Sequence, residues 1–557
     1  ITPQGEVHRP TRVQTSQPRG KQGGIYVDNA VMTVQFSDLQ VGDLIHLRYQ
    51  IEEVSHRNLF GDYFGDVVYL QERIPIARMV YLVDFPKDRP LYSGGRGLPA
   101  PQLTEEGSRR LYRWEVSPVP AMRYEPGMPG YTETSPYLIV STYGSWEELA
   151  RWYADLVRPQ LVLDAGDQAL AQRLVAGITD EREKIRAIHG WVLKSTRYVG
   201  IEFGIHGFKP YRASQVLRRG YGDCKDKASL LITLLAEVGI PARLVLIRTI
   251  DRGRLLPEPA TLWGFNHAIA YIPSQDLWLD GTAETAGLLE LPHLDQGATV
   301  LVVDPLTGRG QLGETPVLPA AANRWVTEVE GRLLADLSLE ARVRETSTGQ
   351  GASRVRRDYQ DPSTRRIRLE KVLASRFPGM EVLEADVEHI ERLDLPPVLA
   401  FSLVQPAVLR QEGEGHSLPL SLFPGQLAAQ LAKESSREYE RLLEFPWEEE
   451  GRVSLQLPAG CRVAGALPAP SELTSAFGTF ALRIDAAGPE RVRLESRLAL
   501  RQRRILPAEY KDFRKFLLEV DALEARRLPL RCEPAALPLP PAAFPLQAPG
   551  APGEVRP

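Results

Sequence analysis

The stretch from residue 224 to 239 constrains the fold most, because a long apolar helix pattern there is followed directly by strands. In CKDKASLLITLLAEVG the apolar residues recur at helical spacing, at Leu230, Leu231, Leu234, Leu235 and Val238. Gly239 ends the pattern, as a helix C-terminus requires. The segments ARLVLIRT, FNHAIAYI and LWLDGT come next and read as consecutive strands. This order predicts an α+β domain over about residues 160–315.

The regions on either side have sequence patterns typical of strands and not of helices. Residues 1–150 contain short apolar or alternating pieces separated by Gly, Asp and Pro, which predicts a β-rich domain. Residues 320–525 return to strand patterns with two helical interruptions, which predicts a second β-sandwich-like domain. Residues 526–557 form a Pro/Ala-rich tail, and we expect its stretch PAALPLPPAAFPLQAPGAPGEVRP to be disordered. The predicted fold class is therefore multidomain α+β, with a central core between two β-sandwich-like domains.

Composition excludes several functions. The 557 residues carry a formal net charge of -4, and the arginines are scattered among acids, so no nucleic-acid partner is predicted. No apolar run approaches the ~20 residues of a membrane span. The three cysteines lack zinc-site spacing and are too few for a disulfide framework, and neither phosphate-loop motif occurs. We predict no cofactor and no metal, and the oligomeric state stays open.

Cys224 falls where a helix N-terminus is expected. Gly222 and Asp223 supply a tight turn and an N-cap, which places Cys224 in the first helical turn. Unpaired N–H groups and the helix dipole favour an anion there, and we expect Lys225 and Lys227 to add positive potential. A thiolate is the reactive form of cysteine, so this position suits a nucleophile.

A base and a group that orients it follow downstream. His267 begins one strand and Asp280 ends the next, and the PSQD turn between them predicts a hairpin that brings the two together. Each residue alone has a structural interpretation: an inert cysteine, a packed histidine, a turn aspartate. The three together, each where the geometry demands it, favour a Cys–His–Asp triad.

Other residues receive a structural interpretation. Thr179 is the expected N-cap of the helix in TDEREKIRAIHGWVLKST, and Asp226 is expected to contact the Cys224 helix terminus. A surface loop position is preferred to a cleft position for His206, and core packing is preferred to a cleft wall for Trp263 and Trp278. No candidate base accompanies the other two cysteines, Cys461 and Cys532. Glu202 and His293 have no stronger claim to a functional role.

The sequence resembles a known family at these motifs. The segment RYVGIEFGIHGFKPYRASQVLRRGYGDCKDKASLLITLLAEVGIPARLVLIRT, with FNHAIAYI and WLDGTAE, is similar to the transglutaminase-like, papain-type core of bacterial DUF3857-type proteins. The phrases ITPQGEV and VGDLIHLRYQIEE resemble the DUF3857 β-domain, and ILPAEYKDFRKFLLEVDAL resembles the domain after the core. The family usually has further strands before ITPQGEV, so we expect the chain to begin inside its first domain.

The resemblance implies roles for the site residues. Cys224 would be the nucleophile, His267 the general base and acid, and Asp280 the orienting carboxylate. The backbone N–H of Cys224 and the side chain of Tyr198 are the candidate oxyanion donors.

The implied function is cysteine-dependent acyl transfer on peptide or protein amides, as a peptidase or amidase or as a transglutaminase-like enzyme. Hydrolysis is the default because water is abundant. The alternative is a non-catalytic cell-envelope scaffold that uses the core to bind a protein. The expected partner is a peptide or protein, and the expected location is periplasmic or the cell envelope. We expect the loop IDRGRLLPEPATLWGF to cover the site.

Overall fold

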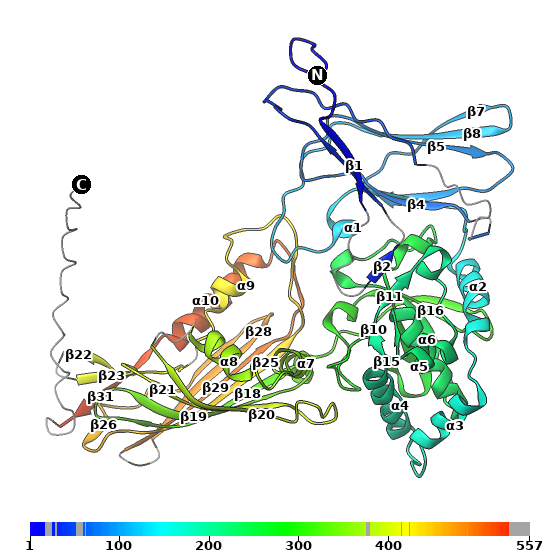
Figure 1. Cartoon of the computed structure of the whole chain (residues 1–557). Helices are drawn as coiled ribbons and strands as arrows, with labels where there is room; N and C mark the ends of the chain where they lie inside the picture. Colours follow the sequence, from blue (N-terminus) through cyan, green and yellow to red (C-terminus); the bar gives the residue numbers. More distant parts are fainter. Residues whose placement is uncertain are drawn as a thin grey trace, which may run out of the picture. The chain divides into compact units, whose positions relative to one another are not determined.

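A computed structural model describes most of the chain: residues 1–16, 25–27, 30–51, 60–61, 63–374, 379–413, 415–422, 424–486, 488 and 490–533. The chain forms two compact units (Figure 1). The first comprises residues 1–319 with the later segments Ser436–Phe445 and Arg503–Ala508, and the second comprises the rest. The expected tail, residues 526–557, lies outside the described residues from 534 onward.

The N-terminal part of the first unit is built from short strands. Its main body is two three-stranded antiparallel sheets, β4-β9-β6 and β5-β8-β7, which share a core of Val83, Phe85, Tyr112, Trp114, Leu138 and Val140. The elements are β1 (Arg12–Ser16), β2 (Ile25–Val27), β3 (Val31–Gln35), β4 (Gly65–Tyr69), β5 (Met79–Pro86), β6 (Tyr92–Arg96), β7 (Gln102–Glu106), β8 (Arg109–Val116), α1 (Tyr131–Thr134) and β9 (Tyr137–Ser141). Alternating buried and exposed residues along β5 and β8 explain why two sheets stack here.

The rest of the first unit is an α+β core. An antiparallel sheet in the order β15-β14-β13-β16-β17 packs against helix α6. The helices are α2 (Trp146–Val157), α3 (Ala165–Leu174), α4 (Glu181–Ser195), α5 (Ala213–Arg219) and α6 (Cys224–Glu237). The strands are β10 (Arg197–Tyr198), β11 (Gly200–Glu202), β12 (Tyr221–Gly222), β13 (Arg243–Arg248), β14 (His267–Ile272), β15 (Leu277–Leu279), β16 (Thr299–Val303) and β17 (Gly310–Glu314). The predicted helix-then-strands order is confirmed.

Helix α6 is the centre of this core. Residues 225–235 are buried on every side of the helix, and Leu230, Leu231, Leu234 and Leu235 among them are fully buried. Asp223 is its N-cap, and Gly239 past its end has φ of 80°. Burial on all faces fixes the helix axis, and therefore fixes where its first residue, Cys224, stands. The N-cap expected at Thr179 is wrong by one residue, because Asp180 accepts the hydrogen bond from the Glu183 N–H of α4.

Two short segments from the expected third domain pack in the first unit. Strand β24 (Arg441–Leu442) pairs with β30 (Arg504–Ile505). Arg504 forms ion pairs with Glu133 at 2.7 Å and with Glu440 at 2.8 Å. Glu125 accepts hydrogen bonds from the N–H groups of Glu438 and Tyr439 at 3.0 and 3.1 Å. The chain therefore returns to the first unit twice after leaving it.

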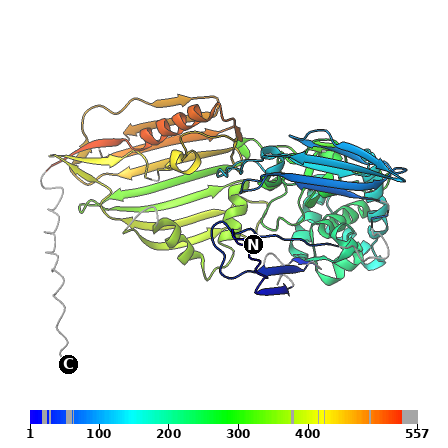
Figure 2. The same ribbon diagram turned by 90° about the horizontal axis from the view of Figure 1, so that it is seen from above.

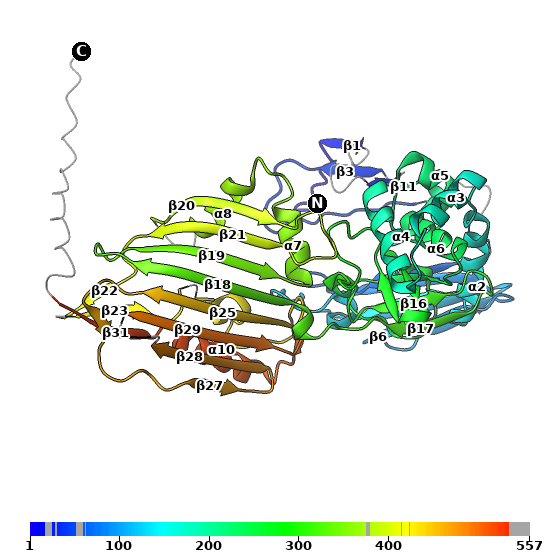
Figure 3. The same ribbon diagram turned by 90° about the horizontal axis from the view of Figure 1, so that it is seen from below.

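The second unit is built on one eight-stranded sheet, in the order β20-β21-β19-β18-β25-β29-β28-β27 (Figure 3). Helices α9 and α10 lie over one side of it (Figure 2), where alternate strand residues are buried, and α8 packs beside β20. The elements are β18 (Arg324–Leu333), β19 (Leu339–Ser347), α7 (Gln350–Asp358), α8 (Arg365–Ala374), β20 (Glu381–Glu388), β21 (Val398–Gln405), β22 (Arg410–Glu412), β23 (Gly415–Pro419), α9 (Leu427–Leu431), β25 (Trp447–Gln456), β26 (Cys461–Val463), β27 (Ser471–Thr474), β28 (Gly478–Ala486), β29 (Arg491–Leu500), α10 (Tyr510–Glu524) and β31 (Arg527–Cys532).

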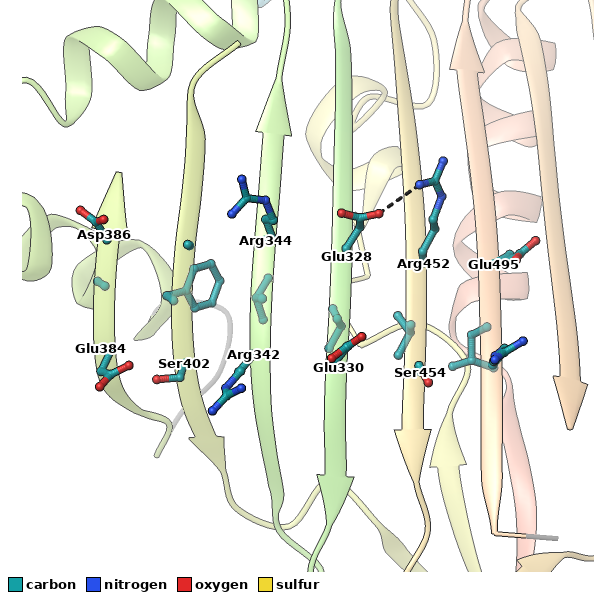
Figure 4. A pocket seen from close by; sticks show the side chains of 18 residues that line it. Glu328, Glu330, Arg342, Arg344, Glu384, Asp386, Ser402, Arg452, Ser454 and Glu495 are labelled. Carbon is teal, nitrogen blue, oxygen red and sulfur yellow. Dashed lines mark hydrogen bonds and ion pairs between the residues drawn. The ribbon is translucent and has the colours of Figure 1, made fainter. Parts of the chain in front are cut away.

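The opposite side of this sheet carries charged side chains around an open hollow of about 870 Å³ (Figure 4). Acids and arginines alternate across neighbouring strands and pair with each other. Arg452 contacts Glu328 at 3.0 Å, and Arg344 contacts Glu388 at 2.7 Å. Such exposed pairs suit a solvated sheet face, and each contributes little to stability.

A disulfide joins Cys461 of β26 to Cys532 of β31, which are directly paired residues of antiparallel strands. Three cysteines cannot form a framework, and no local pattern indicated this single bond between residues 71 apart. Cys224 is the free cysteine. Among the described residues, no helix combines the length and apolar character needed to cross a membrane.

Candidate active site

Cys224 is the first residue of α6 and is half-buried. Asp223 and Asp226 form a capping box in which each carboxylate accepts a hydrogen bond from the other residue's N–H, at 3.2 and 3.3 Å. Asp226 also pairs with Arg219 at 2.7 Å, which confirms its expected contact with the helix terminus. The thiol thus stands at a rigid, fully capped helix start.

The two lysines after Cys224 differ in what they contact. Lys225 is 5% exposed, and its Nζ lies 2.5 Å from Asp223 Oδ2, close enough to Cys224 to interact with it electrostatically. Lys227 is fully buried and points away, donating to the Thr196 carbonyl at 2.6 Å and pairing with Glu284 at 3.6 Å. Lys225 can therefore add positive potential at the thiol, whereas Lys227 holds the core together.

His267 lies between Cys224 and Asp280. Its Nε2 is 3.3 Å from Asp280 Oδ2, with side-chain exposures of 15% and 6%, and its ring is also hydrogen-bonded to Cys224. The β14–β15 hairpin that brings them together pairs Ile272 with Leu277, as the PSQD turn predicted. Burial disfavours the imidazolium, but the charge of Asp280 and the two hydrogen bonds raise the pKa of His267 well above its ordinary value.

Asp280 is held in its ionised form by several donors. Thr282 donates to Asp280 Oδ1 from its N–H at 2.8 Å and from its hydroxyl at 2.7 Å. Burial alone would raise the pKa of Asp280, but His267 and these donors lower it. His189 on α4 hydrogen-bonds to the Asp280 backbone, and burial lowers the pKa of His189 to about 4, so its ring is neutral at pH 7.

Asp295 is the site residue that the sequence did not indicate. It is 2% exposed, lies in the turn His293–Asp295 and is hydrogen-bonded to Asp280 through its side chain. One side-chain atom from each of His267, Asp280 and Asp295 lies within 4.8 Å of the other two, so the three groups form one cluster. The separation of Asp295 from Asp280 along the chain matches neither helical nor hairpin spacing, so no local sequence pattern identifies Asp295 as a site residue.

The remaining predicted residues surround the cysteine or lie apart from it. Tyr198 of β10 is half-buried, and burial together with the charge of Cys224 raises the pKa of its hydroxyl. Glu202 faces Lys225 at 4.0 Å. His206 stacks on Tyr211 with ring centres 4.0 Å apart.

The two tryptophans have different surroundings. Trp263 is 48% exposed and meets Phe60 and Phe208 edge-on, so it is a surface aromatic and the expected core packing is wrong for it. Trp278 packs on Tyr271 with ring centres 4.3 Å apart, which confirms its packing role.

The loop over residues 250–265 is anchored at both ends. Arg248 donates to the Gly253 carbonyl at 2.7 Å and to the Gly264 carbonyl at 3.0 Å, and Tyr137 accepts from the Leu256 N–H at 3.1 Å. These bonds fix the loop's shape. That it covers the site stays a prediction.

Family comparisons match three stretches of the chain. A domain of unknown function, DUF3857, matches residues 1–123. The transglutaminase-like superfamily matches residues 168–280, which include Cys224, His267 and Asp280. A second domain of unknown function, DUF3858, matches residues 416–530. The chain is a DUF3857-type protein with a transglutaminase-like core. The resemblance seen in the sequence is confirmed, and Asp295 lies beyond the matched part of the core.

One solved structure supports the fold of this DUF3857-type chain. A "putative protease" from Parabacteroides distasonis is 18% identical with a TM-score of 0.55, and the match covers 85% of this chain and 75% of that one. A "putative cysteine protease" from Cytophaga hutchinsonii is 16% identical, with 45% and 88% coverage, and its TM-score of 0.20 carries no argument. No curated protein matches the chain. The first similarity shows the shared multidomain α+β fold.

Proposed function

We propose that this protein is a cysteine-dependent acyl-transfer enzyme that acts on peptide or protein amides through Cys224, His267 and Asp280. The observation that carries the proposal is the position of His267, bonded on one side to the thiol and on the other to a buried carboxylate. That arrangement is what nucleophilic catalysis by cysteine requires.

The residues divide the chemistry as follows. His267 takes the thiol proton, and the Cys224 thiolate attacks the carbonyl carbon of the amide, giving a tetrahedral intermediate. Its oxyanion is stabilised by the Cys224 backbone N–H and by the Tyr198 hydroxyl. The C–N bond breaks, the amine leaves with the proton from His267, and a thioester remains. Water, deprotonated by His267, then releases the acid and restores the thiol. Asp280 keeps the imidazole oriented and stabilises its charged form.

Hydrolysis is the proposed outcome, and transfer to an amine is the variant reaction. A primary amine in place of water would resolve the same thioester with the same residues. The choice depends on which nucleophile reaches the thioester, so peptide substrates must be tested with and without an amine.

We also propose a periplasmic or cell-envelope location. The support is the Cys461–Cys532 disulfide, since such bonds persist in oxidising compartments and are rare in the cytosol.

The first test is alkylation of Cys224 by iodoacetamide, followed by mass spectrometry, in wild type, His267→Ala and Cys224→Ser. Because His267 holds the thiol proton, the wild-type rate should stay nearly constant from pH 7 to 6. An ordinary thiol, with a pKa of about 8.5, slows about tenfold over the same interval. His267→Ala should restore the ordinary slope, and Cys224→Ser should remove the labelled site.

A second measurement separates enzyme from scaffold. The protein is incubated with a peptide mixture, with and without a primary amine, and products are identified by mass. Cleavage supports hydrolysis, and an amine adduct supports transfer. A wild-type labelling slope equal to that of His267→Ala, together with no product, contradicts the enzyme and leaves the non-catalytic scaffold.

A further inference from the structure

We propose that Asp295 is a positioning residue of this site: a neutral carboxylic acid that donates a hydrogen bond to the carboxylate of Asp280. This inference deepens the proposed function, and the effect of Asp295 on Cys224 rests on that function. The relay then runs from the thiol through His267 and Asp280 to Asp295, outside the matched core segment.

The contact between the two acids demands a proton. Asp280 and Asp295 are both buried, and a carboxylate oxygen of one lies within 4.8 Å of a carboxylate oxygen of the other, with a hydrogen bond between the two side chains. Two carboxylates cannot accept from each other, and two buried like charges in contact are strongly unfavourable. One of the two must therefore be protonated, and it is the donor.

The surroundings decide which acid holds the proton. Asp280 faces His267 and receives two hydrogen bonds from Thr282, all of which favour its ionised form. Asp295 Oδ2 has no hydrogen-bond partner among the described residues. The largest electrostatic effects on Asp295 come from Asp280, His267 and Asp251 of the packed turn Ile250–Arg252, and of these three only His267 favours a carboxylate. The Arg503 guanidinium is a further positive charge, and it binds the backbone carbonyls of the turn. Burial and the Asp280 charge raise the pKa of Asp295 to about 8.

Asp295 is presented to Asp280 by a rigid turn. Arg503 donates to the carbonyls of His293, at 2.7 Å, and of Gln296. The Thr315 hydroxyl donates to the Asp295 carbonyl, and the Asp295 N–H donates to Pro292 at 2.9 Å. Arg503 belongs to the segment Arg503–Ala508 that returns to the first unit. A turn fixed from three sides suits a residue that must hold another side chain in place.

The test compares Asp295→Asn, Asp295→Leu and the matched control Asp251→Asn. Asparagine keeps a neutral donor of the same shape, leucine removes the donor, and Asp251 is a neighbouring half-exposed acid. At pH 6 the Cys224 alkylation rate should stay within about twofold of wild type in Asp295→Asn and Asp251→Asn. The alkylation rate should fall about tenfold in Asp295→Leu, because residues in one hydrogen-bond network are coupled by about that much. The wild-type profile should also show an inflection near pH 8 that Asp295→Asn lacks.

Infrared spectroscopy gives a readout that does not depend on the reaction. At pH 7 the wild-type spectrum should contain a buried protonated-carboxyl band that disappears in Asp295→Asn and persists in Asp251→Asn. Absence of that band overturns the proposal, as does a labelling rate in Asp295→Asn as low as in Asp295→Leu. A protonated-carboxyl band that appears only after treatment with EDTA also overturns it, in favour of a cation between the acids. If Cys224 proves unreactive while the band is present, the proposed function fails and the protonation of Asp295 stands.

Discussion

At the residue scale, the ionisation of the site follows from the number of donors each buried acid receives. Asp280 is surrounded by donors and stays ionised, whereas Asp295 meets mainly negative charge and keeps its proton. His267 between the thiol and Asp280 is charged because the carboxylate charge exceeds the cost of its burial. Asp280 and Asp295 have the same intrinsic acidity, so their different protonation follows from position and not from residue type.

A stability measurement checks the protonation of Asp295. The pKa of Asp295 is about 8 in the folded protein, against about 3.9 in an unfolded chain. Between these values the unfolded state releases a proton that the folded state keeps, so the wild-type free energy of unfolding decreases as pH rises from about 4 to 8. Asp295→Asn removes that dependence. Its Tm relative to wild type should therefore increase steadily from pH 4 to 8 in calorimetry, and a constant difference would contradict the assignment.

At the element scale, the N-terminus of α6 combines a helix cap with a buried ion pair. Asp223 caps the helix through the Asp226 N–H and at the same time neutralises Lys225, and the two charged side chains are 1% and 5% exposed. Loss of Asp223 would leave a buried ammonium without its partner. The position of Cys224 therefore depends on the Asp223 carboxylate, which both caps the helix and pairs with Lys225.

The expected result for Asp223→Ala is a decrease of about 3–5 kcal/mol in the free energy of unfolding, the cost of breaking a buried pair. Ser145→Ala is the matched control, because Ser145 caps α2 through the Glu148 N–H at 3.3 Å without a buried charge. That variant should lose only about 1 kcal/mol. Asp223→Asn, which keeps the cap and loses the charge, should fall between the two. Urea unfolding measures all three, and equal losses in both alanine variants would exclude the ion-pair contribution.

At the scale of the whole molecule, contacts between distant parts of the chain complete each unit. Segments Ser436–Phe445 and Arg503–Ala508 contribute β24, β30 and Arg503 to the first unit. In the second unit the Cys461–Cys532 bond ties β31 to β26 across 71 residues. Removal of such a cross-link should mainly increase the entropy of the unfolded chain.

The double variant Cys461→Ala/Cys532→Ala should lose about 4 kcal/mol of unfolding free energy, as expected for a closed loop of this length. Hydrogen exchange should locate the loss in β26, β31 and their neighbours, while Cys224 keeps its alkylation rate. Without reductant, native wild type should show one titratable thiol, and three would contradict the disulfide.

Local patterns explain what could be predicted about the site. The leucine spacing, Asp223 and Gly239 define α6 within 17 residues, and the β14–β15 hairpin is a short-range element with a clear turn signal. Cys224, His267 and Asp280 stand at the ends of these elements, so element geometry alone predicts that they meet. The family comparisons confirmed the fold class that this order implied.

Long-range packing decided the rest. Asp295 reaches Asp280 only because β16 adds to the sheet beside β13, and Arg503 holds its turn from more than 200 residues later in the chain. The Cys461–Cys532 bond likewise depends on a strand pairing with no local signal. Helix periodicity and hairpin turns are properties of neighbouring residues, so the sequence by itself determined the three residues of the proposed triad. Which acid keeps a proton depends on burial and on charges brought together by folding, and only the tertiary structure decided that.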